Sequence, residues 1–144
     1  MSFNSIYEIA GSGMQAQTTR LNTIASNLAN ANSASGTEEG AYKALRPVFE
    51  SVFERLESQP GQRRGEVGGA SVRISDIAVS TNEADKRFEP GNPISDEEGF
   101  VYYSNVNVVE EMADMMSASR SFQTSVDVIS RANSMQQGLL QLGK

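Results

Sequence analysis

The sequence contains no cysteine, no histidine and no tryptophan. Without cysteine there is no disulfide and no thiolate site, and without histidine the commonest general base and the commonest transition-metal ligand are missing. Aromatic residues make up only 7% of the 144 residues. No stretch approaches the roughly 20 consecutive apolar residues of a membrane span. We therefore expect neither an enzyme nor a cofactor, a bound metal or a membrane-spanning segment.

Positive charge is also scarce. The formal net charge is −6, and the twelve Lys and Arg residues are scattered, with Arg63 and Arg64 as their densest group. Nucleic acid is not an expected partner, because its recognition needs clustered positive charge. The N-terminus lacks the basic start and apolar run of a secretory signal. If the protein leaves the cytoplasm, we expect it to do so without cleavage of such a leader.

The remaining candidate metal-binding, phosphate-binding and catalytic motifs lack residues that such sites require. The acidic run 96–98 is too compact for the twelve-residue loop of an EF-hand, which favours a solvated turn. Gly65, Gly68 and Gly69 do not form a phosphate-binding loop, and the serines around Arg120 have no base to activate them. The methionines at 112, 115 and 116 are typical of adaptable packing.

The last third of the chain carries one long apolar repeat. Its members are Val108, Met112, Met115, Phe122, Val126 and Ile129, after which the repeat shifts, as at a three-residue stammer, to Ala132, Met135, Leu139 and Leu142. Neither glycine nor proline occurs between Asn107 and Gln137. The pattern predicts a helix from Asn107 to about Leu142, with Asn107 and Glu110 as a capping pair.

The first residues carry a matching repeat. Its members are Phe3, Tyr7, Ala10, Met14, Gln17, Leu21, Ile24, Leu28 and Ala31. It predicts a helix from Ser5, capped with Glu8, to Ala31, paired with the C-terminal helix as an antiparallel coiled coil with the two termini side by side. Gln17 is interpreted as a register device or an edge position. Because residues 1–37 hold only Glu8 and Arg20 as charges, we expect other subunits to cover this helix, the alternative being plain polar surface.

Residues 42–104 are predicted to form a small β-rich insertion. Residues 42–53 have apolar weight but an ambiguous register, and residues 72–79 and 100–103 are predicted strands. Between these strands, Pro90 and Pro93 flank Gly91-Asn92 and indicate an extended approach, a turn and an extended exit. Residues 58–71 are predicted to be a flexible loop open to proteases. The expected fold is mainly α, with residues 1–41 and 105–144 as a helical domain.

Three segments resemble the signatures of one family. Residues Ile24-Ala25-Ser26-Asn27-Leu28-Ala29-Asn30-Ala31-Asn32 with Gly40-Ala41-Tyr42-Lys43, and Val106-Asn107-Val108-Val109-Glu110-Glu111-Met112 with Met116-Ser117-Ala118-Ser119-Arg120-Ser121-Phe122-Gln123, are similar to the N- and C-terminal signatures of bacterial flagellar rod and hook proteins. The segment 88–93, with Gly99-Phe100-Val101 behind it, and the short chain resemble the proximal-rod members. The linker 33–42 departs from the family pattern, being longer and more polar.

The resemblance implies a structural role. Members of the family pair their terminal helices into an inner domain around the axis of a hollow tube, and later flagellar proteins are exported through that tube. Proximal-rod subunits belong to the drive shaft that crosses the periplasm and passes torque to the hook. They are secreted by the flagellar type III apparatus without leader cleavage. The implied partners are other rod proteins, copies of the chain itself and this export apparatus.

The expected site residues follow from the two repeats and the resemblance. The subunit contacts and coiled-coil seam are assigned to Tyr7, Met14, Leu21, Ile24, Leu28, Met112, Met115, Phe122, Val126, Ile129 and Leu139. The family motif residues are Ser26, Asn27, Asn30, Tyr42, Pro90, Gly91, Asn92, Pro93 and Arg120. We expect Asn27, Asn30 and Asn32 to satisfy backbone groups near the helix end. Arg120 either pairs with a carboxylate of an adjacent subunit or is solvated.

Two alternatives stay open from the sequence. A needle or adaptor subunit of a related type III secretion apparatus would not need the β-rich insertion. A self-contained helical protein would be a fully helical monomer, whereas a rod subunit is predicted to keep its terminal helices largely disordered until assembly.

Overall fold

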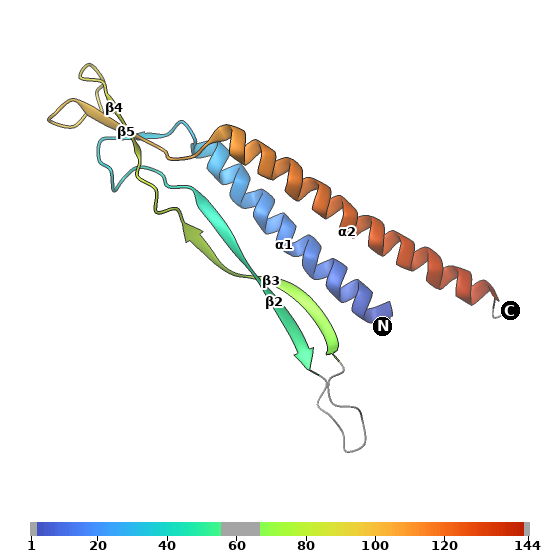
Figure 1. Ribbon diagram of the computed structural model, residues 1–144. Helices are drawn as coiled ribbons and strands as arrows, with labels where there is room; N and C mark the ends of the chain where they lie inside the picture. Colours follow the sequence, from blue (N-terminus) through green and yellow to red (C-terminus); the bar gives the residue numbers. More distant parts are fainter. Residues whose placement is uncertain (1–2, 56–66, 143–144) are drawn as a thin grey trace.

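The computed structural model of the chain describes residues 3–55 and 67–142 (Figure 1). Its elements are α1 (Phe3–Asn30), β1 (Ala34–Ser35), β2 (Leu45–Arg55), β3 (Val67–Val79), β4 (Asp85–Phe88), β5 (Phe100–Tyr103) and α2 (Val108–Leu142). Two long helices thus enclose, in sequence, a set of antiparallel strands. This confirms a mainly α fold with a small β-rich insertion.

The two helices run antiparallel, and both chain ends lie at the same end of the molecule (Figure 1). Their bounds differ slightly from the prediction. Since α1 begins at Phe3, Ser5 lies inside the helix and is not its cap. Asn107 does cap α2, because its Oδ1 accepts hydrogen bonds from the N–H groups of Val109 (3.1 Å) and Glu110 (3.4 Å). The carboxylate of Glu110 pairs with Arg46 instead of returning to the cap.

Strands β2 and β3 form a long antiparallel hairpin that lies along α1, on the side away from α2 (Figure 1). Ser75 is an extra residue in β3, because Val48 faces Asp76 while Phe49 faces Ile74. A two-stranded ribbon is marginal alone. It packs on α1, where Ala16 is 3% exposed and the Ser12 hydroxyl accepts a hydrogen bond from the Val72 N–H (3.2 Å).

The hairpin corrects the loop predicted for residues 58–71. Residues 58–66 lie outside the described part of the chain, but residues 67–71 belong to β3. The glycines at 68 and 69 had favoured a turn, yet they lie in a strand with a pairing partner on one side only, where glycine is tolerated. The ambiguous segment 42–53 contributes all but its first three residues to β2.

The other three strands form the tip sheet, in the order β1, β5, β4, which lies beyond the end of the helices opposite the termini (Figure 1). Strands β1 and β4 were not predicted, since β1 has two residues and β4 is polar. The basic side chains of β4 lie over the rings of β5. Lys86 Nζ is 3.9 Å from the centre of the Phe100 ring, and the Arg87 guanidinium is 4.6 Å from that of Tyr103.

Asn105, which follows β5, links the start of the hairpin to the segment that follows β3. Its Oδ1 accepts a hydrogen bond from the Ala44 N–H (2.8 Å), and its Nδ2 donates to the Asn82 carbonyl (2.8 Å). The Ser80 N–H donates to the Ala44 carbonyl, also at 2.8 Å. These bonds fix the start of β2 against the segments that follow β3 and β5.

The buried apolar residues of the described chain are mostly small. They are Ala10, Ala16, Ile24, Ala31, Ala41, Ala44, Val101, Ala118 and Ala132. Such residues let the helices approach closely but bury little apolar area. Many large apolar side chains therefore remain on the surface.

Candidate assembly surface

The seam between the helices is defined here by the buried and partly buried α2 positions that recur at the spacing of a helical repeat. They are Glu111, Met115, Ala118, Phe122, Ser125, Ile129 and Ala132, with regular steps of four and three residues. The next position, Gln136, accepts a hydrogen bond from the Tyr7 hydroxyl (3.4 Å). The regular spacing continues through Ala132 to Gln136, so the predicted stammer after Ile129 is wrong.

Three predicted α2 positions are not covered by α1. Met112 is 54% exposed, Val126 36% and Leu139 57%, whereas Met115, Phe122 and Ile129 are partly buried in the seam. The seam runs through the small residues Ala118 and Ser125, which carry no strong hydrophobic signal. A role of the three exposed residues in contacts between subunits stays a prediction.

On α1, the predicted seam positions are all at least partly covered. Ile24 is 3% exposed, and Tyr7, Met14, Leu21 and Leu28 are of intermediate exposure. Gln17 also lies here, and its Oε1 is buried with no hydrogen-bond partner among the described residues. An unsatisfied buried acceptor weakens the pairing of the isolated helices. Its role in setting the register stays a prediction.

The outer face of α2 is defined here by Val109, Met112, Met116 and Arg120. Their spacing of three, four and four residues places them on one side of the helix. Val109 is 76% exposed, Met112 54% and Met116 59%. Arg120 is exposed, and no carboxylate of the described residues lies within ion-pair distance of it. The sequence repeat had pointed to Met112 but not to Val109 as part of an apolar stripe.

Asn27 binds the end of α1 to the start of β2. Its Nδ2 donates to the Leu45 carbonyl (2.9 Å), while its Oδ1 accepts hydrogen bonds from the Leu45 N–H (2.9 Å) and the Tyr42 hydroxyl (3.0 Å). The side chain is 1% exposed. Burial, followed by the negative charge of Glu111, raises the pKa of Tyr42. Two motif residues, Asn27 and Tyr42, thus form one hydrogen-bonded unit.

The other motif residues near α1 have smaller roles. Asn30 donates from Nδ2 to the Ser26 carbonyl (2.8 Å), and its own carbonyl accepts from the N–H (3.0 Å) and hydroxyl (2.7 Å) of Ser33. These bonds end the helix and turn the chain. The side chains of Ser26 and Asn32 are exposed.

A cluster of charged residues joins α1, β2 and the first turns of α2. Arg20 pairs with Asp114 at 2.9 Å, and Arg46 pairs with Glu110 at 3.1 Å and with Asp114 at 3.7 Å. Next to it lies a pocket of about 230 Å³, the junction pocket, lined by Arg20, Ile24, Leu45, Arg46, Pro47, Phe49, Glu111 and Asp114. Glu111 is only 2% exposed. Nothing in the sequence had indicated that this carboxylate is buried.

The proline-containing loop of the tip makes two consecutive turns, whereas the sequence predicted a single turn with an extended exit; the turn at Gly91-Asn92 is confirmed and the extended exit is wrong. The Asn92 N–H donates to the Glu89 carbonyl, and the Ser95 N–H donates to the Asn92 carbonyl, both at 3.0 Å. Pro90 and Pro93 each take the second position of a turn, where their fixed φ is favourable. The Glu89 carboxylate accepts hydrogen bonds from Asn92 Nδ2 (2.9 Å) and the Tyr103 hydroxyl (3.1 Å).

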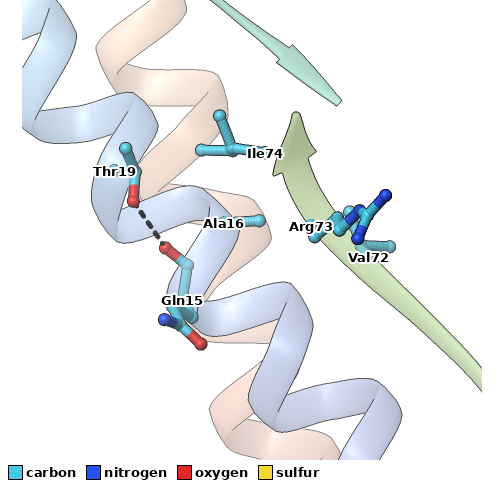
Figure 2. Close-up of a pocket in the computed structure, with 6 residues that line it drawn as sticks. All are labelled: Gln15, Ala16, Thr19, Val72, Arg73 and Ile74. Carbon is cyan, nitrogen blue, oxygen red and sulfur yellow. Dashed lines mark hydrogen bonds between the residues drawn. The ribbon is translucent and has the colours of Figure 1, made fainter. Parts of the chain in front are cut away.

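A second hollow lies between α1 and β3 and has a volume of about 260 Å³ (Figure 2). It is lined by Gln15, Ala16, Thr19, Val72, Arg73 and Ile74, and the Thr19 hydroxyl donates to the Gln15 carbonyl (3.2 Å). This lining offers no nucleophile paired with a base. Across the described ranges, no group of acidic residues is placed to hold a metal ion. Neither described helix has an apolar stretch suited to crossing a bilayer.

Known proteins resemble the chain along its whole length. A family described as "Flagella basal body rod protein" matches residues 8–36, and one described as "Flagellar basal body rod FlgEFG protein C-terminal" matches residues 97–142. Proteins named "Flagellar basal-body rod protein FlgC" from Salmonella typhimurium and Escherichia coli O157:H7 are 41% and 40% identical over all 144 residues, which is 100% of each chain. One from Agrobacterium fabrum is 36% identical over 124 residues, 85% of this chain and 81% of its own. The likeness therefore covers both helices and the strands between them.

Proposed function

Because the chain belongs to the FlgC family of flagellar basal-body rod proteins, we propose that it assembles with its neighbours through the helical face that its own fold leaves uncovered. It is a structural subunit of the rod and not an enzyme, as its full-length relatives are named for that structure. A rod subunit assembles with other rod components. The surface that makes these subunit contacts is inferred from the exposure of the helices.

The observation that supports the proposal is the exposure of the outer face of α2. Val109, Met112 and Met116 are all more than half exposed and lie on one side of the helix. A fully buried side chain of this size is stabilised by roughly 1.5–3 kcal/mol relative to an exposed one. Covering the three in a subunit contact would contribute a few kcal/mol, repeated at every subunit along the rod.

We further propose that the helices lie on the inside of the assembly. The helix pair is proposed to be an antiparallel coiled coil that forms, with residues 1–41 and 105–144, the inner domain around the rod axis. Its support is the small number of charges in residues 1–37 together with the uncovered apolar face of α2. Residues 42–104 would then lie further from the axis.

Further parts of the proposal come from the family. The neighbours are copies of the chain and other rod proteins, and the assembled shaft is hollow, crosses the periplasm, transmits torque and lets export substrates pass. The subunit itself is proposed to reach the rod through the flagellar type III export apparatus without losing a leader.

The test is Met116→Asp, compared with Ser117→Asp in a strain that lacks its own copy of the gene. Both variants add one negative charge to the same turn of α2, but only Met116 lies on the outer face. We expect Met116→Asp to abolish basal bodies and swimming at an unchanged protein level, while Ser117→Asp swims. Phe122→Asp would be less informative, because Phe122 packs within the chain. Normal swimming of Met116→Asp would refute the outer face as the assembly surface.

A further inference from the structure

The junction pocket contains a carboxylate without a partner. Glu111 is 2% exposed and lines the pocket, yet neither a hydrogen bond nor an ion pair to its carboxylate is present among the described residues. The two arginines of the pocket are already engaged, Arg20 with Asp114 and Arg46 with Glu110 and Asp114. With three carboxylates against two guanidinium groups, one negative charge is uncompensated. A buried charge of this kind is costly unless a cation approaches it.

In the described part of the chain, the outer face of α2 carries a cation without a partner, in contrast to the unpaired carboxylate of the pocket. Arg120 is exposed beside the apolar side chain of Met116, one helical turn away, and has no carboxylate within ion-pair distance among the described residues. If assembly covers this face, the guanidinium loses water and requires an anion. Glu111 lies in the seam toward α1, so the pocket and the outer face are on different sides of α2. Arg120 therefore cannot fill the pocket of its own chain without unwinding the helix.

Two different, complementary surfaces on one chain join copies head to tail, and such contacts repeat into helical filaments. We propose that Arg120 of a second copy enters the junction pocket and pairs with Glu111, so that the outer face of one α2 covers the junction of α1, β2 and α2 of its neighbour. The inference rests on the proposed function and adds the specific contact. The apolar part of the pocket, including Phe49 at 41% exposure, would receive the methionines beside Arg120.

The first experiment is a double-mutant cycle with Glu111→Gln and Arg120→Gln, read as basal bodies per cell by electron microscopy. Glu111→Gln keeps the shape of the side chain and removes a buried charge. In sodium sulfate, which favours the folded state of the isolated chain, this variant should unfold at the same or a higher temperature than the unchanged chain. We expect each single variant to lower assembly roughly tenfold or more, and the double variant to be no worse than either single one. Effects that multiply, or an isolated Glu111→Gln chain that unfolds more easily, would overturn the pairing.

The second experiment uses the absence of cysteine in the chain. Met116→Cys combined with Phe49→Cys leaves both charged groups in place, and a short bismaleimide should link copies into dimers and longer ladders in isolated basal bodies. The matched control is Met116→Cys with Phe53→Cys, because Phe53 lies on the same strand, is more exposed at 65% and does not line the pocket. The control should give no ladder.

The outcomes separate this contact from the proposed function. A link to a different rod protein, or equal linking through Phe53, would overturn pairing between copies at the pocket. If in addition Met116→Asp still abolishes basal bodies, the outer face remains the assembly surface and only the partner of Arg120 is wrong. If Met116→Asp assembles normally, both proposals fail together.

Discussion

The hydrogen bonds of Asn27 make a quantitative prediction about how the hairpin is held. Asn27→Ala would remove the partners of three groups, namely the Leu45 N–H, the Leu45 carbonyl and the Tyr42 hydroxyl. A buried polar group left without a partner costs about 1–3 kcal/mol. Because Leu45 and Tyr42 are only partly buried and water can reach them, the lower end applies. We expect the free energy of unfolding to fall by about 3 kcal/mol.

The matched control is Asn22→Ala, which makes the same substitution on the exposed side of the same helix. Both variants gain the same helix propensity, so their difference isolates the hydrogen bonds. For a small protein the urea dependence of the unfolding free energy is roughly 1–3 kcal/mol per M. Asn27→Ala should therefore lower the urea midpoint by about 1–3 M, while Asn22→Ala leaves it nearly unchanged.

The assay is urea unfolding followed by far-UV circular dichroism. Sodium sulfate is added at the same concentration to every sample, because it strengthens apolar burial and populates a folded baseline for helices that lack their neighbours. Tyrosine fluorescence gives a second signal, since the chain has no tryptophan and Tyr42 itself donates to Asn27. Equal midpoints for the two variants would refute the claim that Asn27 holds the hairpin to α1.

Two further predictions concern the tip sheet. Gly99 has a φ of +84°, and an added Cβ would lie 3.1 Å from the Phe88 ring and from Pro90 Cβ. We therefore expect Gly99→Ala to lower the free energy of unfolding by about 1 kcal/mol or more in the same urea assay. The control Gly91→Ala, whose Cβ would meet nothing within 4 Å, should be nearly neutral. The pKa of Asp96 is lowered, first by the Phe100 N–H, because folding favours its carboxylate. The contribution of the Asp96 carboxylate to stability is therefore complete above its ordinary pKa of 3.8 and is lost as the pH falls through the lower pKa of the folded state. Because the Tyr102 hydroxyl donates to Asp96, the NMR signals of Tyr102 should shift below about pH 4. The shift should persist in the neighbouring control Glu97→Gln and be absent in Asp96→Asn.

The sequence predicted the helices well because their signals are long. The repeat of α1 runs for the whole helix, and its predicted seam is covered in the structure. On α2 the same reasoning failed in part, because counting apolar residues favours Met112 and Val126 over the smaller Ala118 and Ser125. Close helix packing selects small side chains, and their burial has no strong signature in a single sequence.

The strands and the buried polar residues were harder to predict. Strand β4 pairs with β5 and has its cations over the aromatic rings of that strand, contacts between residues more than a dozen positions apart. Asn27 does bond backbone groups, as expected, but those of Leu45 at the start of β2 and not those of its own helix end. Glu111 lies beside the exposed Glu110 in sequence, and only the three-dimensional arrangement shows that one is buried and the other paired with Arg46.

The distribution of side-chain size over α2 argues that this fold is completed by its neighbours. In a protein that is stable alone, large apolar residues of an amphipathic helix face inward and small or polar ones face outward. Here Ala118 and Ala132 are at most 5% exposed, whereas Met112 and Met116 are more than half exposed. The small residues bring α1 and α2 close together at little gain in burial, and Met112 and Met116 become buried only when another chain covers them. Assembly and folding of the helices are therefore expected to be coupled, because contacts with other subunits would bury apolar side chains that the single chain leaves exposed.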